Sequence, residues 1–193
     1  MIGERIEESI FQLAKEYQGN GAFFFHNEAD LKCRLFGLIR SNIGDKQLVH
    51  SEWGEDKPYG RYDLVVWRPS EKDAAFNCWG CSHSELMEKV PDLILAAIEI
   101  DCLYGGCAKA NQFTTDSGLG NNKDIQKLIQ NNKDSFPYCY LILFWDDEAS
   151  EKFPEVVAEI SEKCEQLLLK HKIRSICISR EKDNILFKLG YLN

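Results

Sequence analysis

The chain has 193 residues, of which 44% are hydrophobic and 28% are charged, and its formal net charge is −8. This length predicts a single domain over residues 1–193 with a substantial core, and the composition is ordinary for a soluble globular protein. Because 31 acidic residues outnumber 23 basic ones, the charge counts against a broad electropositive surface for nucleic acid, although it leaves room for a local basic groove.

No apolar run in the sequence is long enough to span a bilayer. The first residues lack the basic-then-apolar layout of a secretion signal. We therefore expect no membrane partner and a cytoplasmic location.

Hydrophobic periodicity predicts both helices and strands along the chain. The second helix begins at Asn27, a favourable N-cap residue, which places Glu28 in the first turn, where the helix dipole favours a carboxylate. In chain order we expect helices at 4–18 and 27–41, strands at 48–53, 60–67 and 93–101, a helix at 123–131, a strand at 138–145, a helix at 151–170, and strands at 173–179 and 185–189.

Two segments between these elements are irregular. Residues 68–92 are too polar for the core and form an insertion between two core strands, and residues 104–122 form a loop rich in Gly, Asn, Thr and Ser. The strand at 138–145 is apolar on both faces and is therefore central. The whole pattern predicts an α/β domain with a mixed central β-sheet flanked by helices.

Two of the expected strands carry acidic residues where a buried strand should carry none. One contains Asp63, and the other ends Ala-Ile-Glu-Ile-Asp with Glu99 and Asp101, which alternation places on one side of the strand. A carboxylate is costly to desolvate unless a cation or a hydrogen-bond donor faces it. If Asp63 lies across from the other two, three carboxylates converge, and a divalent metal ion is the simplest neutraliser.

In their order along the chain, these residues resemble the motifs of the PD-(D/E)XK nuclease superfamily, which has the restriction-endonuclease-like fold. The matching elements are Glu28 in an early helix, Gly-Arg-Tyr-Asp-Leu-Val-Val around Asp63, Ala-Ile-Glu-Ile-Asp around Glu99, and a helix that opens Lys-Asp-Ile-Gln-Lys-Leu. The resemblance covers residues 27–145, and it rests on the order of four short motifs more than on any one of them.

Membership of this superfamily implies hydrolysis of phosphodiester bonds in DNA with Mg²⁺ or Mn²⁺. Asp63 and Glu99 would hold the metal, which polarises the scissile phosphate and lowers the pKa of the attacking water. Glu28 would ligate a second metal or support the first indirectly. Nucleases that cut both strands often dimerise, so a homodimer is a further expectation.

The chain departs from the superfamily at Asp101, which stands where the motif usually has a lysine. Three accounts are open. Asp101 could itself act as a metal ligand or base, or Lys123 or Lys127 in the following helix could supply the missing lysine. Alternatively, catalysis could be lost and the fold kept for binding a protein or nucleic-acid partner.

A purely structural interpretation also explains the acids. Asp63 would cap a turn, and the other two acids would form surface ion pairs with Arg61 or with lysines of the following helix. Against this, Glu99 follows Leu-Ala-Ala-Ile, where a solvated charge is unexpected. The nuclease interpretation instead requires a cationic side chain near the Asp63 and Glu99 carboxylates. Three basic residues of the second helix could touch a phosphate backbone or simply form a solvated face: Lys32, Arg34 and Arg40.

The eight cysteines are scattered, and buried free thiols are the simplest interpretation for most of them. The exception is Cys-Trp-Gly-Cys-Ser-His in the insertion. There Cys78 and Cys81 could bind a structural zinc ion completed by His83 or by Cys102 and Cys107. A second C-x-x-C is lacking, and no strand-to-helix setting supports a redox role.

Overall fold

The computed structural model describes residues 1–18, 27–44, 48–53, 62–68, 94–103, 123–131, 136–145, 165–167 and 169–179. Its elements in chain order are α1 (Ile2–Gln18), α2 (Glu28–Ile43), β1 (Val49–Trp53), β2 (Tyr62–Trp67), β3 (Ile94–Leu103), α7 (Lys123–Asn131), β4 (Tyr138–Trp145) and β5 (Ile173–Ser179). Residues 165–167 and 169–171 are also helical.

The five strands form one mixed sheet in the order β1-β2-β3-β4-β5. β1, β2 and β3 are antiparallel neighbours, whereas β3, β4 and β5 run parallel. Pairing changes from antiparallel to parallel at β3. A parallel neighbour requires a crossover connection, and α7 lies between β3 and β4 in the chain. The expected α/β architecture with a mixed sheet and helices is thereby confirmed.

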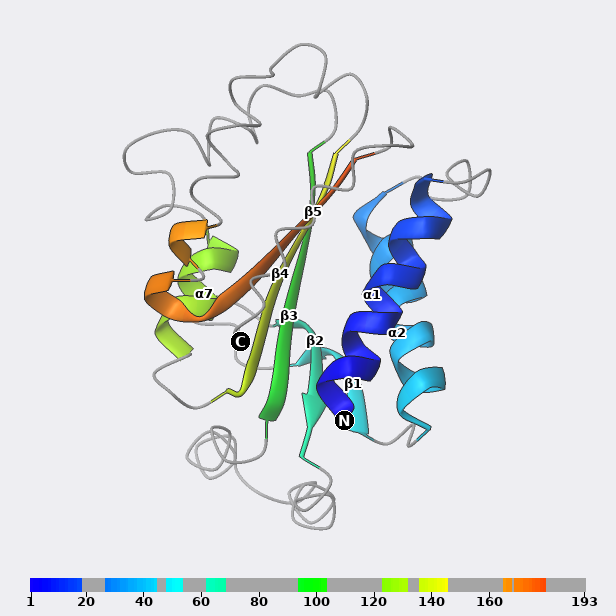
Figure 1. Cartoon of the computed structure of the whole chain (residues 1–193), viewed down its shortest axis with the longest axis horizontal. Coiled ribbons are helices and arrows are strands. Elements are labelled where there is room, and N and C mark those ends of the chain that lie inside the picture. The colour runs from blue at the N-terminus through cyan, green and yellow to red at the C-terminus, as the bar shows by residue number, and fades with distance from the viewer. Residues whose placement is uncertain are drawn as a thin grey trace.

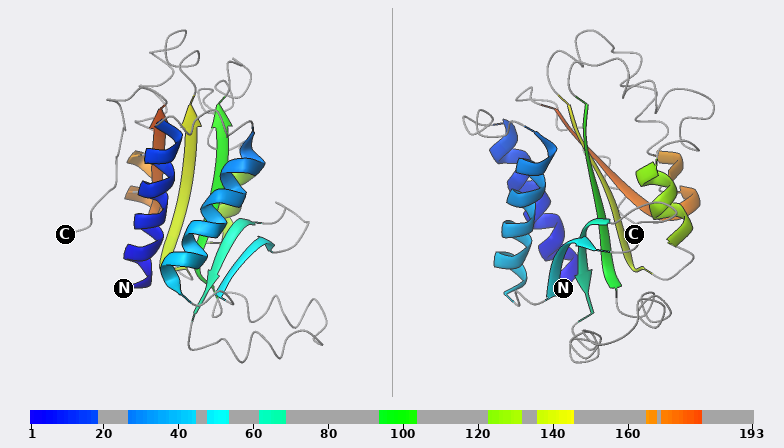
Figure 2. Two further views of the ribbon diagram at one scale, coloured as in Figure 1. Left: turned by 90° about the vertical axis from the view of Figure 1, so that its right-hand side faces the viewer. Right: turned by 180° about the vertical axis from the view of Figure 1, so that it is seen from behind.

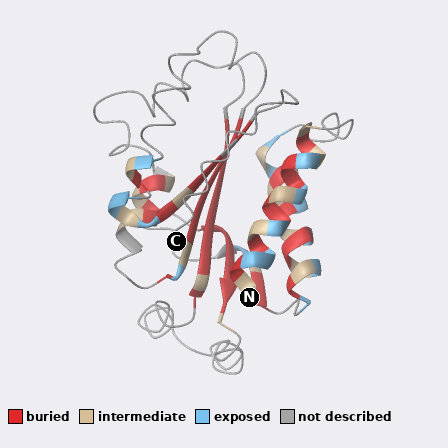
Figure 3. Ribbon diagram, in the orientation of Figure 1, coloured by how far each residue is buried: buried red, intermediate tan, exposed pale blue. Residues whose placement is uncertain are grey.

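Helices cover both faces of this sheet (Figures 1 and 2). α1 and α2 pack against each other on one face, and α7 lies on the opposite face beside the helical residues 165–167 and 169–171. Figure 3 shows the strands buried along most of their length between the two helical layers. Asp63, Glu99 and Asp101 therefore lie in the middle layer of three, whereas Glu28 lies in the layer of α2.

The two N-terminal helices follow directly from their sequences. α1 buries one face at helical spacing, which includes Ile6, Ile10, Leu13 and Tyr17. The Asn27 side chain caps α2 by accepting a hydrogen bond of 3.1 Å from the Asp30 N–H, as expected. Gly44 caps the C-terminal end of α2, and its φ of 80° is in the left-handed region that glycine adopts without strain.

β4 is a central strand, as its sequence predicts, because β3 and β5 flank it on both sides. Two of its aromatic side chains pack beneath α1. The ring of Phe144 lies 5.0 Å from that of Tyr17, centroid to centroid, and the Tyr140 hydroxyl donates a hydrogen bond of 3.1 Å to Glu7. These contacts show that Tyr140 and Phe144 point to the face of the sheet that α1 covers.

Several expected segments lie outside the described residues. They are the insertion beyond Arg68, the loop at 104–122, the strand at 185–189 and most of the helix at 151–170, of which the described part is helical. Among the described helices, none is long and apolar enough to cross a membrane.

Candidate functional site

The acids of β3 are directed away from α1. The parallel register pairs Ile98 with Tyr140, which is on the α1 side of the sheet. Because side chains alternate along a strand, Glu99 and Asp101 are on the other side, toward α7. Both are buried, with 1% and 5% of their surfaces exposed.

Asp63 is brought near Glu99 by the pairing of β2 with β3. The antiparallel register joins Leu64, which directly follows Asp63, to Ile98, which directly precedes Glu99. The two carboxylates are close enough for the charge of Asp63 to act on Glu99. This is the convergence that the sequence predicts for these two residues.

Both carboxylate oxygens of Asp63 have partners. Oδ1 lies 2.6 Å from Nζ of Lys32 on α2, and Oδ2 accepts a hydrogen bond of 2.7 Å from the Ile100 N–H. The second contact takes a backbone donor of β3 at the place where β2 and β3 diverge. Asp63 therefore ties α2 to β3, and it is not the turn cap of the purely structural interpretation.

Glu99 is the most deeply buried acid of the group. Its Oε1 lies 2.8 Å from Nζ of Lys127, which makes a buried ion pair. Oε2 has no hydrogen-bond partner in the described part of the chain. Burial, then the charge of Asp63, raises the pKa of Glu99 well above its usual 4.5, against the opposing attraction of Lys127.

Lys127 is itself almost fully buried and is held from two sides. Its Nζ lies 3.3 Å from Oδ1 of Asp124, one turn earlier on α7, and 5.8 Å from the centroid of the Tyr62 ring. Burial opposes the charged form, but attraction to Glu99, and then to Asp124 and Asp63, raises the pKa of Lys127 above its usual value. The pairing of Glu99 with Lys127 forms as the structural interpretation expects, yet it is buried rather than at the surface.

Asp101 has a more local environment. Its Oδ1 accepts a hydrogen bond of 2.8 Å from the Cys102 N–H, its own neighbour in β3. Within the described ranges, no three His, Cys, Asp or Glu side chains are grouped so as to hold a metal ion. The metal triad of Asp63, Glu99 and Asp101 thus stays a prediction, and lysine ammonium groups face two of its members.

The remaining candidate residues are placed less fully. Glu28 lies in the first turn of α2, one turn before Lys32. Lys123 begins α7, and its side chain is outside the described residues. The zinc candidates Cys78, Cys81, His83 and Cys107 also lie outside them, while Cys102 is a buried free thiol.

Two residues of this cluster were undervalued by sequence reasoning. The sequence leaves Lys32 open as a phosphate contact or as part of a solvated helix face, and it does not single out Asp124. Their spacing was the available clue, because Lys32 follows Glu28 by one turn and Asp124 precedes Lys127 by one turn.

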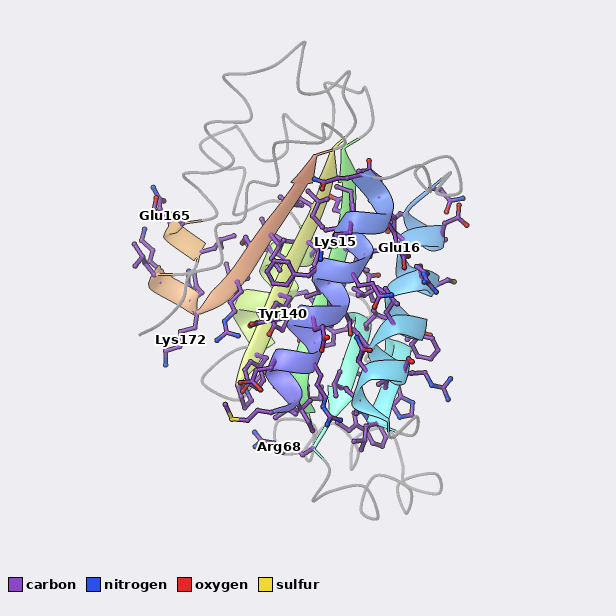
Figure 4. All side chains as sticks on the ribbon, turned by 45° about the vertical axis from the view of Figure 1, so that its right-hand side comes forward. Lys15, Glu16, Arg68, Tyr140, Glu165 and Lys172 are labelled. Atoms are coloured by element: carbon purple, nitrogen blue, oxygen red, sulfur yellow. The ribbon has the colours of Figure 1, made fainter. Side chains whose placement is uncertain are left out.

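A second polar cluster lies on the α1 side of the sheet, where Figure 4 shows Tyr140 beneath α1. Arg174 of β5 donates to Oε1 of Glu7 at 2.7 Å and to the Tyr140 hydroxyl at 3.2 Å. Burial, then the charge of Glu7, raises the pKa of Tyr140 well above 10.0. With every member hydrogen-bonded and the phenol neutral, this cluster joins α1 to β4 and β5.

Compared with known proteins, the chain matches no protein-family model, no curated protein and no solved structure.

Proposed function

We propose that the chain is a Mg²⁺-dependent nuclease with the restriction-endonuclease-like fold, which hydrolyses phosphodiester bonds of DNA. The observation that carries this proposal is the set of contacts around two acids: Asp63 accepts a hydrogen bond from the Ile100 N–H, directly after Glu99, and Lys127 lies 2.8 Å from Glu99. The order of motifs behind the resemblance is the order of α2, β2, β3 and α7 in the chain. α2 contacts β2 and β3 on one face of the sheet, and α7 contacts β3 on the other.

The side chains at this place suit a divalent cation. Oε2 of Glu99 is buried without a hydrogen-bond partner among the described residues, and carboxylate oxygens are the ligands that hard cations prefer. Asp63 and Glu99 would hold the ion, with Asp101 two residues further along the same face of β3. Once bound, the ion would polarise the phosphate and lower the pKa of the attacking water.

The chain's own residues would then orient the substrate. Lys127 supports the account in which the missing motif lysine has moved to the following helix, because its ammonium group reaches the Glu of the Glu-x-Asp motif. Glu99 and Asp124 hold that ammonium group in place before substrate arrives. A preorganised positive charge beside the scissile phosphate stabilises the charge that develops on it during hydrolysis.

The first experiment is thermal melting of the metal-free protein with and without Mg²⁺ or Mn²⁺, for the native chain, Glu99→Gln and Glu8→Gln. Glu8 is an exposed residue of α1 and serves as the matched control. Metal that binds only the folded state should raise the melting temperature of the native chain and of the control, and Glu99→Gln should remove most of that rise.

Cleavage of single- and double-stranded DNA then tests the reaction itself. We expect metal-dependent cleavage by the native chain and by Glu8→Gln, with strong loss in Asp63→Asn and Glu99→Gln. Cleavage that survives both substitutions would contradict the assignment of the site.

A catalytically inactive module that binds a protein or nucleic-acid partner is the second candidate. It is favoured by one observation: Asp63 and Glu99 are each already engaged by a lysine, and both oxygens of Asp63 have partners. This candidate predicts DNA or protein binding that is indifferent to metal, together with no cleavage, and fluorescence anisotropy with labelled DNA measures the first part directly.

A further inference from the structure

The two lysines that face the acids differ in their access to solvent. The side chains of Lys127 and Glu99 are 4% and 1% exposed, so this pair is enclosed. The side chains of Lys32 and Asp63 are 17% and 12% exposed, so this pair borders solvent. Of the two ammonium groups, that of Lys32 can leave its carboxylate for water with the smaller rearrangement, because its side chain already borders the solvent that would hydrate its charge.

The oxygen that Lys32 contacts is also the one a metal ion would need. Oδ2 of Asp63 is committed to the Ile100 N–H at 2.7 Å, a backbone contact that helps to fix β2 on β3. Oδ1 is the other oxygen, and Nζ of Lys32 lies 2.6 Å from it. A divalent cation and the ammonium group cannot both occupy that position, because each would lie within contact distance of the same oxygen and their like charges repel.

We propose that Lys32 is a positioning residue that competes with a divalent cation for Oδ1 of Asp63. It holds the carboxylate in place in the metal-free protein and is displaced when metal binds. This role rests on the metal site of the proposed function and adds to it a residue that sets the apparent affinity for metal.

Glu28 is an acid on the same helix as Lys32. It precedes Lys32 by four residues on α2, and Glu followed by Lys at this spacing is the favourable orientation for an ion pair on a helix. On metal binding, the Lys32 ammonium group would move from Asp63 toward Glu28, so that its charge would still have a carboxylate nearby. The helix glutamate that the resemblance assigns to the site thus acquires a specific task.

The test is direct measurement of Mn²⁺ binding by calorimetry for the native chain and four variants. Lys32→Met and Lys32→Gln remove the competing charge, Lys32→Arg keeps it, and Lys15→Met removes one charge from the exposed surface of α1, where Figure 4 labels Lys15. Using two neutral variants guards against one of them failing to fold, which circular dichroism would reveal.

We expect Lys32→Met and Lys32→Gln to bind Mn²⁺ about fivefold more tightly or better, a coupling of the size usual between two linked binding events. Lys32→Arg and Lys15→Met should bind like the native chain. A residue with a merely structural role would weaken metal binding when removed, so the direction of the change is the diagnostic result.

The outcomes separate this inference from the proposed function. If the native chain binds Mn²⁺ and the two neutral Lys32 variants bind it equally or more weakly, the competition by Lys32 is overturned and the metal site is retained. Binding by the neutral variants alone supports the competition and overturns metal-dependent catalysis by the native chain. Absence of Mn²⁺ binding in every variant overturns both.

Discussion

Nζ of Lys127 lies 2.8 Å from Oε1 of Glu99, and the two side chains are 4% and 1% exposed. The contact joins α7 to β3 through a pair of charges that have both been removed from water. Such a pair contributes little net stability when compared with an apolar pair, yet loss of one member leaves the other charge buried without its partner. We therefore expect substitutions of Lys127 and of Glu99 to lower the stability of the protein by different amounts.

Lys127→Met should lower the free energy of unfolding by about 3–5 kcal/mol, because Glu99 would remain buried without its cation. Glu99→Gln should cost less, since Lys127 keeps its contact with Asp124. The double variant should recover much of the loss from Lys127→Met. Urea denaturation of the three variants measures this, and losses that simply add would show that the two side chains do not act as a pair.

The pH dependence of stability should carry the signature of Glu99. Its pKa in the folded protein is raised well above the usual 4.5, so the folded state holds this proton more tightly than the unfolded chain. The stability of the native chain relative to Glu99→Gln is then greatest below the unfolded pKa and is lost as pH rises through the folded pKa. Denaturation series between about pH 4 and about pH 8 test this. A relative gain with rising pH would mean that Lys127 outweighs burial and lowers the pKa instead.

Gly3 should be intolerant of even one added carbon. A Cβ at this position of α1 would lie 2.6 Å from two ring carbons of Tyr138, so the aromatic ring or the helix must move. We expect Gly3→Ala to lower the free energy of unfolding by about 1–3 kcal/mol through overpacking.

Gly37→Ala is the matched control for that substitution. Gly37 lies inside α2, and nothing stands within 4 Å of the position its Cβ would take. The same change should there stabilise the protein by up to about 1 kcal/mol, the usual difference in helix propensity between alanine and glycine. Thermal or urea unfolding of both variants measures the contrast, and equal effects would contradict the close packing of α1 on β4.

The cysteines should differ sharply in reactivity. Burial raises the pKa of the Cys139 thiol to about 12, whereas Cys33 is exposed on α2. Iodoacetamide at neutral pH should therefore modify Cys33 in the native protein and reach Cys139 only after denaturation. Mass spectrometry of digested samples gives the extent at each residue, and rapid native labelling of Cys139 would contradict its place in the core.

The positions of the three acids depend partly on local sequence and partly on the pairing of strands. Alternation within one strand suffices to place Glu99 and Asp101 on one side, because the spacing of two residues is a local property of β structure. Whether Asp63 lies near Glu99 depends on how β2 pairs with β3, and a short motif does not specify that register by itself. The resemblance pointed to Asp63 and Glu99 and named Lys127 among two candidate lysines, but it did not single out Lys32 as the partner of Asp63.

The sequence by itself determined the elements: the amphipathic helices, the cap at Asn27, the apolar central strand and the acids within buried strands all reflect short-range periodicity. Only the tertiary structure decided which cation faces which acid. Lys32 meets Asp63 and Lys127 meets Glu99 because two helices, separated from these strands along the chain, pack on the sheet at those positions. Such pairings arise from the packing of the layers, and no local pattern of residues encodes them.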